Sequence, residues 1–481
     1  MSERSHRIDQ TQALLYHARS ATPFCSEDGE PCASIPSSVD SRRVLALRSA
    51  SFRDWLTANF YSEYETAPST SAFRAALRTL EARARYAELP AQKVDRRLSF
   101  EGNPFTPSRV ILDLANANGE LLEISSQGWR TTGNLRHPFY QSPTTLPLPI
   151  PDSSPSLDRP LEQFAEMFRL AGANRTRAFA WLAAALRPVG PYPVLVLRGP
   201  AASGKSMLGR ALRALVDPST APLRRLPLRD RELQQLALQN WILAFDHVSR
   251  IPSKISQALC ALSSGEALEI ARGARDPLVL QLARPLMIIT PTDETRVAWT
   301  PSRALSNRAV TIDLPPIDAL RPEASLWSEF EALRPAILAT LATAVATALR
   351  RIREVDLGNV ARFPDSATWA AAAGPALALD QAEIVDAFDA PSSTWAGSDP
   401  LTEAIHSLLH DHGCWTGSAT ELLSQLGTIR PVGALPANAK GLSQALRQVA
   451  GITVSRKRDS HGERILTIAQ ATNVSAKTAR N

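Results

Sequence analysis

A lysine and a hydroxyl residue follow a glycine-rich turn near the middle of the chain. Residues 199–206 read Gly-Pro-Ala-Ala-Ser-Gly-Lys-Ser, the spacing G-x-x-x-x-G-K-S. Backbone N–H groups of such a loop converge on phosphate oxygens, and the start of a following helix adds partial positive charge. Lys205 would reach the β- and γ-phosphates of ATP, and Ser206 would ligate Mg²⁺. The residues predicted to bind the nucleotide are Gly199, Pro200, Ala201, Ala202, Ser203, Gly204, Lys205, Ser206 and Met207.

The segments on either side of this loop support a phosphate site. Residues 194–197 are apolar and β-branched, as a buried strand requires, and residues 207–216 carry apolar side chains at helical spacing. A strand, a glycine loop and a helix in this order form the context in which the motif binds phosphate. The alternative is a glycine turn that arose by chance, and such a turn would not require a strand before it and a helix after it.

A carboxylate ends a second apolar stretch. Residues 241–246 read Trp-Ile-Leu-Ala-Phe-Asp, and Asp246 is the predicted second Mg²⁺ ligand. A solvated aspartate at the end of a strand is the alternative. His247 follows, where many ATPases carry a second carboxylate that polarises the attacking water. The missing carboxylate argues against fast hydrolysis, although His247 could orient a water molecule.

Residues 262–282 place a basic glycine turn between two apolar stretches, which predicts a β-hairpin. Arg272 and Arg275 lie in the turn, where we expect them to contact phosphates; a solvated turn is the alternative.

The last part of the predicted site supplies a sensor and an arginine. Residues 284–292 predict a buried strand that ends in polar residues, so that Thr292 would sense the γ-phosphate. Arg308 directly precedes another apolar stretch and suits an arginine finger that completes the site of a neighbouring subunit. A surface arginine without such a role is the alternative.

Length and composition indicate a soluble protein of several domains. A chain of 481 residues is too long for one ordinary core, and 44% hydrophobic with 21% charged residues is typical of globular proteins. The net charge of +6 permits a nucleic-acid partner without proving one. The four cysteines lack zinc spacing and predict reduced thiols in the cytoplasm. No membrane span is expected, and residues 336–349 predict a packed helix.

The predicted fold class is an α/β P-loop ATPase core of the AAA+ type, with an α+β N-terminal region and a C-terminal winged-helix domain. In the N-terminal region, residues 52–60 and 73–86 predict helices, and residues 110–114 and 121–124 predict strands on which Asp113 faces solvent. The predicted divisions are a disordered lead over 1–48, a small α+β domain over 49–142, a proline-rich linker over 143–158, the ATPase domain over 159–318, a helical region over 319–390, a linker over 391–399, the winged helix over 400–470 and a tail over 471–481.

The winged-helix prediction rests on three helical stretches followed by two strands around a polar turn. The helices are expected at 401–410, 418–426 and 440–449, and the strands at 451–455 and 464–468. Ser418 and Glu421, three residues apart, predict a capping box at the start of the second helix. Such a domain would read duplex DNA, although many winged helices bind proteins instead. The residues predicted to face a major groove or nearby phosphates are Lys440, Arg447, Arg456, Lys457 and Arg458.

The order of these motifs resembles a known family. Residues 191–316 are similar to the superfamily 3 helicases of small DNA viruses and mobile elements, a branch of the AAA+ ATPases, and residues 50–470 resemble primase/helicase-like ATP-binding proteins of bacterial prophages and integrated elements. The resemblance implies a homo-oligomeric ring, with a hexamer favoured, whose ATP sites are shared between subunits. It also implies that Arg272 and Arg275 contact single-stranded DNA in a central channel. His247 departs from the asparagine of close relatives and the acid of viral members, and Thr292 (or, alternatively, Thr290) stands where a sensor asparagine is usual.

Three hypotheses follow. The first is an ATP-dependent DNA helicase or translocase in the replication of a mobile element, with a separate primase as a partner, because no paired acids for nucleotidyl transfer are present. The second is a nucleotide-dependent DNA-binding switch or scaffold with weak or no ATP turnover, which the residues at His247 and Thr292 favour. The third is a nucleotide-gated defence or regulatory ATPase.

Overall fold

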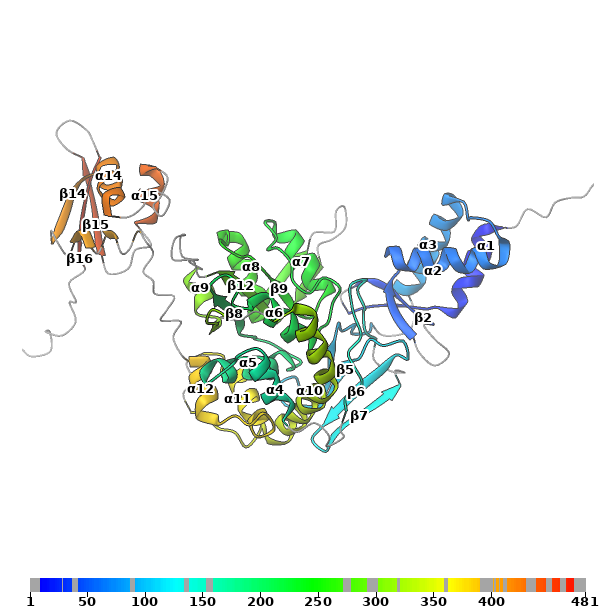
Figure 1. The fold of residues 1–481 in the computed structure, drawn as a ribbon. Coiled ribbons are helices and arrows are strands. Elements are labelled where there is room, and N and C mark those ends of the chain that lie inside the picture. Colours follow the sequence, from blue (N-terminus) through cyan, green and yellow to red (C-terminus); the bar gives the residue numbers. More distant parts are fainter. Residues whose placement is uncertain are drawn as a thin grey trace, which may run out of the picture. The chain divides into compact units, whose positions relative to one another are not determined.

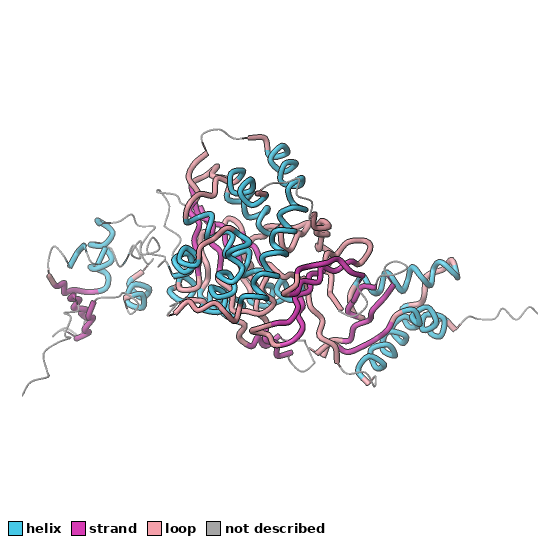
Figure 2. The backbone as a smooth tube through the Cα atoms, turned by 90° about the horizontal axis from the view of Figure 1, so that it is seen from below, coloured by secondary structure: helices cyan, strands magenta, loops and turns pink. Residues whose placement is uncertain are grey.

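The computed structural model describes most of the chain. The described residues are 9–27, 29–36, 42–86, 91–133, 138–152, 159–270, 278–291, 302–317, 321–358, 362–389, 401, 404–405, 407–409, 413–429, 438–446, 452–458 and 464–470. They divide into two compact units, one with the described residues up to 389 and one with those from 401 onward. Each unit has its own buried apolar clusters. Figures 1 and 2 show the helices and strands of the described residues.

The first unit begins with a small sheet covered by helices (Figure 1). Its elements are α1 (Gln10–His17), the 3₁₀ helix η1 (Ala18–Ser20), β1 (Thr22–Cys25), β2 (Pro31–Pro36), β3 (Arg42–Ala46), α2 (Ala50–Tyr64) and α3 (Thr70–Arg85). The strands pair antiparallel in the order β1-β2-β3. Side-chain oxygens of Asp9, Ser49 and Ser69 accept backbone N–H groups at the starts of the three α-helices, as N-caps do.

The prediction of a disordered lead over 1–48 is wrong for the described residues of that stretch. Ala33, Ile35 and Leu45 alternate along β2 and β3 and are buried against Leu14, Phe52 and other apolar residues of α1, α2 and α3. The prolines and serines of this stretch suggested disorder in the sequence and hid the alternation of apolar residues. In the structure Pro31 and Pro36 stand at the two ends of β2, where the missing backbone N–H of proline costs least.

A second antiparallel sheet follows, in the order β4-β5-β6-β7. Its strands are β4 (Leu98–Gly102), β5 (Pro107–Asp113), β6 (Glu120–Ser125) and β7 (Gly128–Gly133). Val110, Leu112 and Ile124 belong to the same core cluster as the central sheet and its helices. The expected solvated position of Asp113 is therefore wrong. Only 2% of Asp113 is exposed, its carboxylate accepts hydrogen bonds from Gln141 Nε2 (3.0 Å) and Ala115 N (2.8 Å), and burial raises its pKa.

The proline-rich stretch expected to link two domains is instead packed against its neighbours. Through residue 152 it is described and extended. Leu146 N donates to Pro218 O, Leu148 N donates to Leu114 O, and Asp152 N donates to Pro335 O. Only 3% of Leu148 is exposed. Residues 145–152 are called the strap below, since they connect the end of the second sheet, the segment at Pro218 and the long helix that contains Pro335.

The central sheet is parallel, with the strand order β13-β8-β12-β9. Its strands are β8 (Val194–Gly199), β9 (Leu243–Phe245), β12 (Leu286–Pro291) and β13 (Ala309–Asp313). The hairpin strands β10 (Ala267–Ile270) and β11 (Leu278–Gln281) pair separately, which confirms the predicted hairpin. The accompanying helices are α4 (Pro160–Met167), α5 (Ala173–Ala185), α6 (Lys205–Ala214), α7 (Asp230–Gln239), α8 (Ser253–Ser264) and α9 (Arg303–Ser306).

Helices complete the first unit. They are α10 (Glu323–Arg351), α11 (Pro364–Ala373), the 3₁₀ helix η2 (Gly374–Leu377) and α12 (Gln381–Asp389). By length and apolar composition, α10 alone among the described helices could cross a membrane, but 78% of its apolar window is buried in the protein. It is a core helix, as the sequence predicted for residues 336–349.

The second unit is smaller. Described residues between 401 and 409 are helical and are followed by β14 (Cys414–Ser418), α14 (Ala419–Ile429), α15 (Ala439–Ala445), β15 (Ile452–Arg458) and β16 (Arg464–Gln470). The strands form an antiparallel sheet in the order β14-β16-β15. Ser418 and Glu421 form the predicted capping box at the start of α14, with hydrogen bonds of 3.3 and 2.7 Å between their side chains and each other's backbone N–H groups. The strand β14 was not predicted.

Candidate nucleotide-binding site

The predicted phosphate loop connects the end of β8 to the start of α6. Gly199 has φ +158° and Gly204 has φ +80°, backbone angles that residues other than glycine rarely adopt. A Cβ at Gly199 would lie 2.5 Å from both Leu314 O and Ser203 Oγ. The glycine spacing of the motif is thus required by the backbone path and by close packing against residue 314.

Lys205 is folded over this loop. Its Nζ donates to Gly199 O (2.8 Å), to Pro200 O (2.5 Å) and to Ser203 Oγ (3.1 Å). Partial burial lowers the pKa of Lys205, and the nearby negative charge of Asp246 opposes that effect. These carbonyl partners are neutral, so phosphate oxygens could replace them with a stronger, charge-assisted interaction.

Asp246 is brought to the same edge of the sheet by strand order. It directly follows β9, and β12 lies between β9 and β8, with Ile288 paired to both Phe245 and Val196. Because the carboxyl ends of parallel strands meet at one edge, the carboxylate lies near the loop. Its side chain is 13% exposed.

His247 lies beside Asp246 and points into solvent. Its side chain is 85% exposed, its Nε2 is 3.9 Å from Asp246 Oδ2, and its backbone N donates to Asp246 Oδ1 (2.7 Å). The residue has φ +56°, a conformation uncommon for residues other than glycine. An exposed ring next to the carboxylate has room to turn toward a bound ligand.

The other residues of the motif differ in exposure. Ser206 is partly exposed at the start of α6, whereas Met207 is 8% exposed and belongs to the hydrophobic core. Any contact of Met207 with a nucleotide would therefore use its backbone. Thr290, the alternative sensor position, is 1% exposed within β12, and Thr292 lies outside the described residues.

Arg308 lies at the opposite edge of the central sheet. Its carbonyl accepts a hydrogen bond from Val194 N at the start of β8 (2.7 Å), whereas the glycine loop follows the end of that strand. Its guanidinium donates to Ser264 Oγ (3.1 Å) and Ala304 O (3.1 Å), with Glu266 Oε1 4.0 Å away. In this structure Arg308 therefore lies away from the glycine loop of its own chain.

The predicted DNA contacts fall largely outside the described parts of the chain. Arg272, Arg275 and Arg447 are not described. For the remaining candidates the backbone alone is described: Lys440 lies on α15, and Arg456, Lys457 and Arg458 lie on β15.

Sequence reasoning missed the segment after β13. Leu314 O lies against Gly199, and Ile317 Cδ1 would be 3.3 Å from a Cβ at Gly204. Asn174 Nδ2 donates to Asp313 O (2.8 Å), which attaches the start of α5 to this segment. The signal available in the sequence was Leu314-Pro315-Pro316, because two prolines keep a chain extended after a strand.

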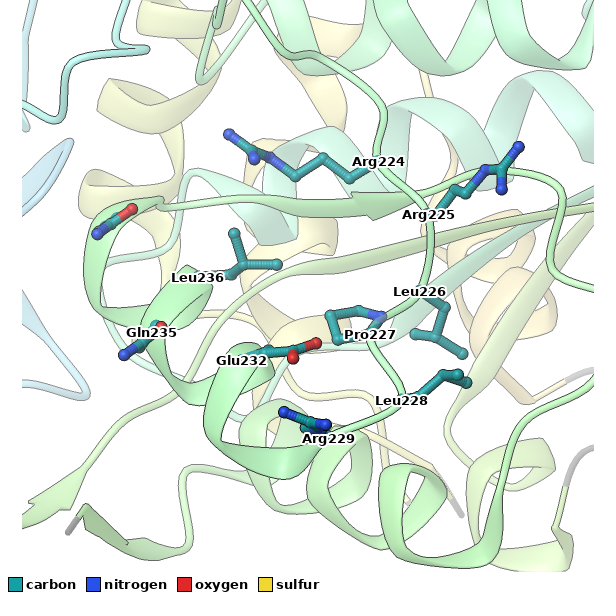
Figure 3. Close-up of a pocket in the computed structure, with 10 residues that line it drawn as sticks. Arg224, Arg225, Leu226, Pro227, Leu228, Arg229, Glu232, Gln235 and Leu236 are labelled. Atoms are coloured by element: carbon teal, nitrogen blue, oxygen red, sulfur yellow. The ribbon is translucent and has the colours of Figure 1, made fainter.

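Two pockets share the segment 224–229, and Asp246 lines one of them. One of about 250 Å³ is lined by Asp246, His247 and Arg250 together with Arg225 and Leu228. The second, of about 700 Å³, lies between the segment 224–229 and α7 (Figure 3). In Figure 3 the side chains of Arg224 and Arg225 point away from each other, and Arg229 lies beside Glu232. The segment 224–229 is joined to β9 because Asp246 N donates to Arg224 O (2.8 Å).

Solved structures resemble the chain only distantly. One is the SCCmec type IV Cch protein, titled an active helicase, with 13% identity and a TM-score of 0.47 over 94% of this chain and 93% of that chain. Another is the C-terminal region of NrS-1, with 10% identity and a TM-score of 0.41 over 96% and 98%. No curated protein matches this chain.

Two family models match the sequence. Residues 162–391 match the actinomycete integrative conjugative element replication protein, AICE RepA. Residues 401–479 match the AICE RepA C-terminal domain. The prediction of a replication protein of a mobile element is thereby confirmed, while membership of superfamily 3 stays a prediction. Together the two matches cover more than half of the chain, which therefore belongs to the replication proteins of actinomycete integrative conjugative elements.

Proposed function

We propose that this chain is a DNA-dependent ATPase of the helicase or translocase type that acts in the replication of its mobile element. The observation that carries the proposal is the meeting of Lys205 and Asp246 at one edge of a parallel sheet, inside the region that matches a replication-protein family. A lysine on a glycine loop, beside a carboxylate at a strand end, is the donor set that ATP with Mg²⁺ needs.

The donors suit Mg²⁺ better than a metal that is bound by protein alone. Among the described residues, no group of three or more His, Cys, Asp or Glu side chains could hold a metal ion. Mg²⁺ commonly takes one or two protein oxygens and completes its shell with phosphates and water. The Ser206 hydroxyl and the Asp246 carboxylate would hold it, and the bound ion would neutralise charge on the phosphates.

The residues of the loop would then bind and orient the triphosphate. Backbone N–H groups between Gly199 and Lys205 would surround the phosphate oxygens. Lys205 would exchange the carbonyls of Gly199 and Pro200 for the β- and γ-phosphates. His247 would position the attacking water from its exposed place beside Asp246.

The separation of Arg308 and the glycine loop supports a ring of identical subunits if Arg308 is an arginine finger. Since Arg308 lies at the other edge of the sheet, a finger role requires a second subunit whose loop faces that edge. A ring places every finger edge against a neighbour's loop edge, and a head-to-tail interface closes in this way. A hexamer is the state we favour, and Thr292 would sense the γ-phosphate within each site.

Two surfaces are assigned to DNA. Arg272 and Arg275, in the turn between β10 and β11, would contact a single strand in the channel of the ring. The C-terminal unit is assigned to the winged-helix type, since α14 and α15 precede the hairpin β15–β16 and β14 pairs with β16. In that arrangement Lys440 and Arg447 would face a major groove of duplex DNA, and Arg456, Lys457 and Arg458 would lie near phosphates.

The second candidate function is a nucleotide-dependent DNA-binding switch or scaffold with weak or no turnover. It is favoured by His247, which stands next to Asp246 where a second carboxylate would otherwise polarise water. The two candidates predict the same ATP binding and differ in hydrolysis.

The decisive experiment measures ATP hydrolysis by the full chain with and without single-stranded DNA. We expect stimulated hydrolysis in the wild type, and its loss in Lys205→Ala and in Arg308→Ala. Matched controls are Lys254→Ala and Arg303→Ala, which change exposed cations on α8 and α9 and should leave the rate unchanged. ATP binding without any hydrolysis in the wild type would contradict the helicase proposal and support the switch.

Mixing the two inactive variants tests whether the site is shared. Lys205→Ala retains an intact Arg308, and Arg308→Ala retains an intact loop, so a mixed ring contains some complete sites. We expect partial recovery of hydrolysis on mixing. If the mixture stays inactive while co-purification of differently tagged variants shows mixed rings, Arg308 does not act between subunits.

A further inference from the structure

The helix α3 in the N-terminal part of the first unit carries a one-sided distribution of charge. Its buried side packs Ala72, Ala76 and Leu80 into the core formed with α1, α2 and the sheet β1–β3. Its exposed side carries four arginines, Arg74, Arg78, Arg83 and Arg85. The single acidic residue of the helix, Glu81, is buried and accepts hydrogen bonds from Arg48 Nε (2.5 Å) and Arg48 Nη2 (2.6 Å).

Three of these arginines lie along one line. At 100° per residue, Arg74, Arg78 and Arg85 fall within about 40° of each other around the helix axis, and they span roughly 16 Å along it. Arg83 points to the opposite side of the exposed surface. We call Arg74, Arg78 and Arg85 the arginine stripe. None of the three forms an ion pair with another residue in the described part of the chain.

The stability of the helix does not explain the stripe. Arg83 and Arg85 occupy the last turn, where positive charge interacts favourably with the helix dipole. Arg74 and Arg78 lie further back, beyond the reach of that effect. They also stand four residues apart, a spacing at which like charges cost about 0.2–0.5 kcal/mol. Their placement therefore points to a partner that supplies negative charge.

We propose that the arginine stripe binds the phosphate backbone of duplex DNA. This inference rests on the proposed function and adds a contact surface in a region that neither family match covers. No aromatic side chain lies on α3 between Arg74 and Arg85. The exposed Tyr86 follows Arg85 at the end of the helix, about 80–120° away from the three arginines around the helix axis, so stacking groups do not alternate with the charges as they do where proteins bind single strands. Duplex DNA presents about one negative charge per 1.7 Å of its axis, a density that a row of arginines can match.

Through the arginine stripe the replication protein binds duplex DNA without regard to its sequence. A straight row of guanidinium groups donates to phosphates without reaching base edges, so it positions the protein and carries no sequence information. The first unit would then hold duplex DNA through α3 while the ATPase site of the same unit acts on a strand.

The test measures binding of the full chain to a labelled duplex of arbitrary sequence, without nucleotide, over a range of salt concentrations. In Arg74→Gln/Arg78→Gln/Arg85→Gln, the slope of log affinity against log salt should fall by about 3, because each lost phosphate contact removes roughly 0.9. The matching lysine triple variant should keep most of the wild-type slope. Glutamine and lysine both favour helices, and the thermal unfolding of each variant checks that the helix is intact.

Three controls make the result specific. Arg83→Gln, on the same helix but off the stripe, should change the slope by clearly less than Arg78→Gln. A single-stranded oligonucleotide and vesicles with anionic lipid should bind the triple glutamine variant as well as they bind the wild type. An unchanged duplex slope would overturn the proposal, and so would an equal loss for single strands or vesicles. Hydrolysis of ATP without DNA should be unchanged in every variant, so a failed ATPase proposal and a failed stripe proposal give different results.

Discussion

Charged side chains at the carboxyl end and at the amino end of the central parallel strands differ in burial and in hydrogen-bond partners. At the carboxyl edge, Lys205 donates to the carbonyls of its own loop, and His247 is exposed. At the amino edge, Asp217 is buried between Arg97 Nε (3.2 Å) and Arg213 NH2 (3.8 Å) and accepts the N–H groups of Trp241 and Ile242 at 3.0 Å each. Burial lowers the pKa of Arg213 to about 10.

The charge of Lys205 can exchange its hydrogen-bond partners, whereas the charge of Asp217 joins separate segments of the fold. The partners of Lys205 are neutral and replaceable, which suits a site that must accept and release an anion. Asp217 has fixed partners from three segments: Arg97 beside the second sheet, Arg213 on α6 and the backbone before β9. The same helix α6 thus begins at the exchangeable edge and ends at the fixed edge. The predictions below test this contrast from the largest expected effect to the smallest.

Removing Asp217 should have the largest effect. Asp217→Ala leaves Arg97 and Arg213 buried without a counter-charge, which we expect to lower the free energy of unfolding by about 3–5 kcal/mol. Chemical denaturation of the full chain measures the change. Asp313→Ala is the matched control, because Asp313 pairs with Arg198 near the other edge and is 50% exposed, so its loss should cost about 1 kcal/mol or less. Equal effects of the two substitutions would contradict the contrast between the edges.

Gly199→Ala should weaken nucleotide binding without unfolding the protein. The new Cβ would lie 2.5 Å from Leu314 O, so the loop must shift, at a strain of about 1–3 kcal/mol. ATP affinity should then fall roughly 5- to 150-fold, at 1.4 kcal/mol for each factor of ten. Isothermal titration measures it. Gly427→Ala, where the new Cβ meets no atom within 4 Å, should bind ATP as the wild type does. Wild-type affinity in Gly199→Ala would show that this loop does not hold phosphate.

The smallest expected effect is a pH dependence of ATP affinity. Burial lowers the pKa of Lys205 in the free protein below its ordinary 10.5, and bound phosphate raises that pKa again. Affinity should therefore be constant at neutral pH and fall as pH rises through the free-state pKa. The limiting slope is about tenfold per pH unit, since one proton is bound with the nucleotide. Lys205→Arg stays charged throughout and should show no such fall. A pH-independent affinity in the wild type would mean that Lys205 does not pair with the nucleotide.

The sequence predicted those features that depend on neighbours along the chain. The glycine loop, α6 and the capping boundaries at Ser69 and Ser418 are local patterns, and the structure has them. The strand that carries Asp246 was also recognisable from its apolar run. What local pattern could not supply was the order and the parallel direction of the strands. The order places Asp246 near Lys205, and the parallel direction leaves Arg308, which precedes β13, at the other end of the strands.

The missed features depend on distant partners. Asp217 was not singled out because Arg97 stands 120 residues before it, so no spacing in the sequence connects them. Asp113 was expected in solvent for the same reason, since Arg97 and Gln141 reach it only in the fold. The N-terminal sheet was missed because its prolines and serines suggested disorder more strongly than its short apolar alternation suggested strands.

The strap limits the positions at which this chain can be cut into parts that still fold. The family match begins at residue 162, yet Leu148, Leu112 and Val110 belong to the same hydrophobic core as β8 and α10. A fragment that starts where the family match starts would expose that core and remove Arg97 from Asp217. The second sheet and the strap therefore form one folding unit with the region that begins at residue 162. A fusion or truncation that keeps this unit folded should cut before Arg97 and not at residue 162.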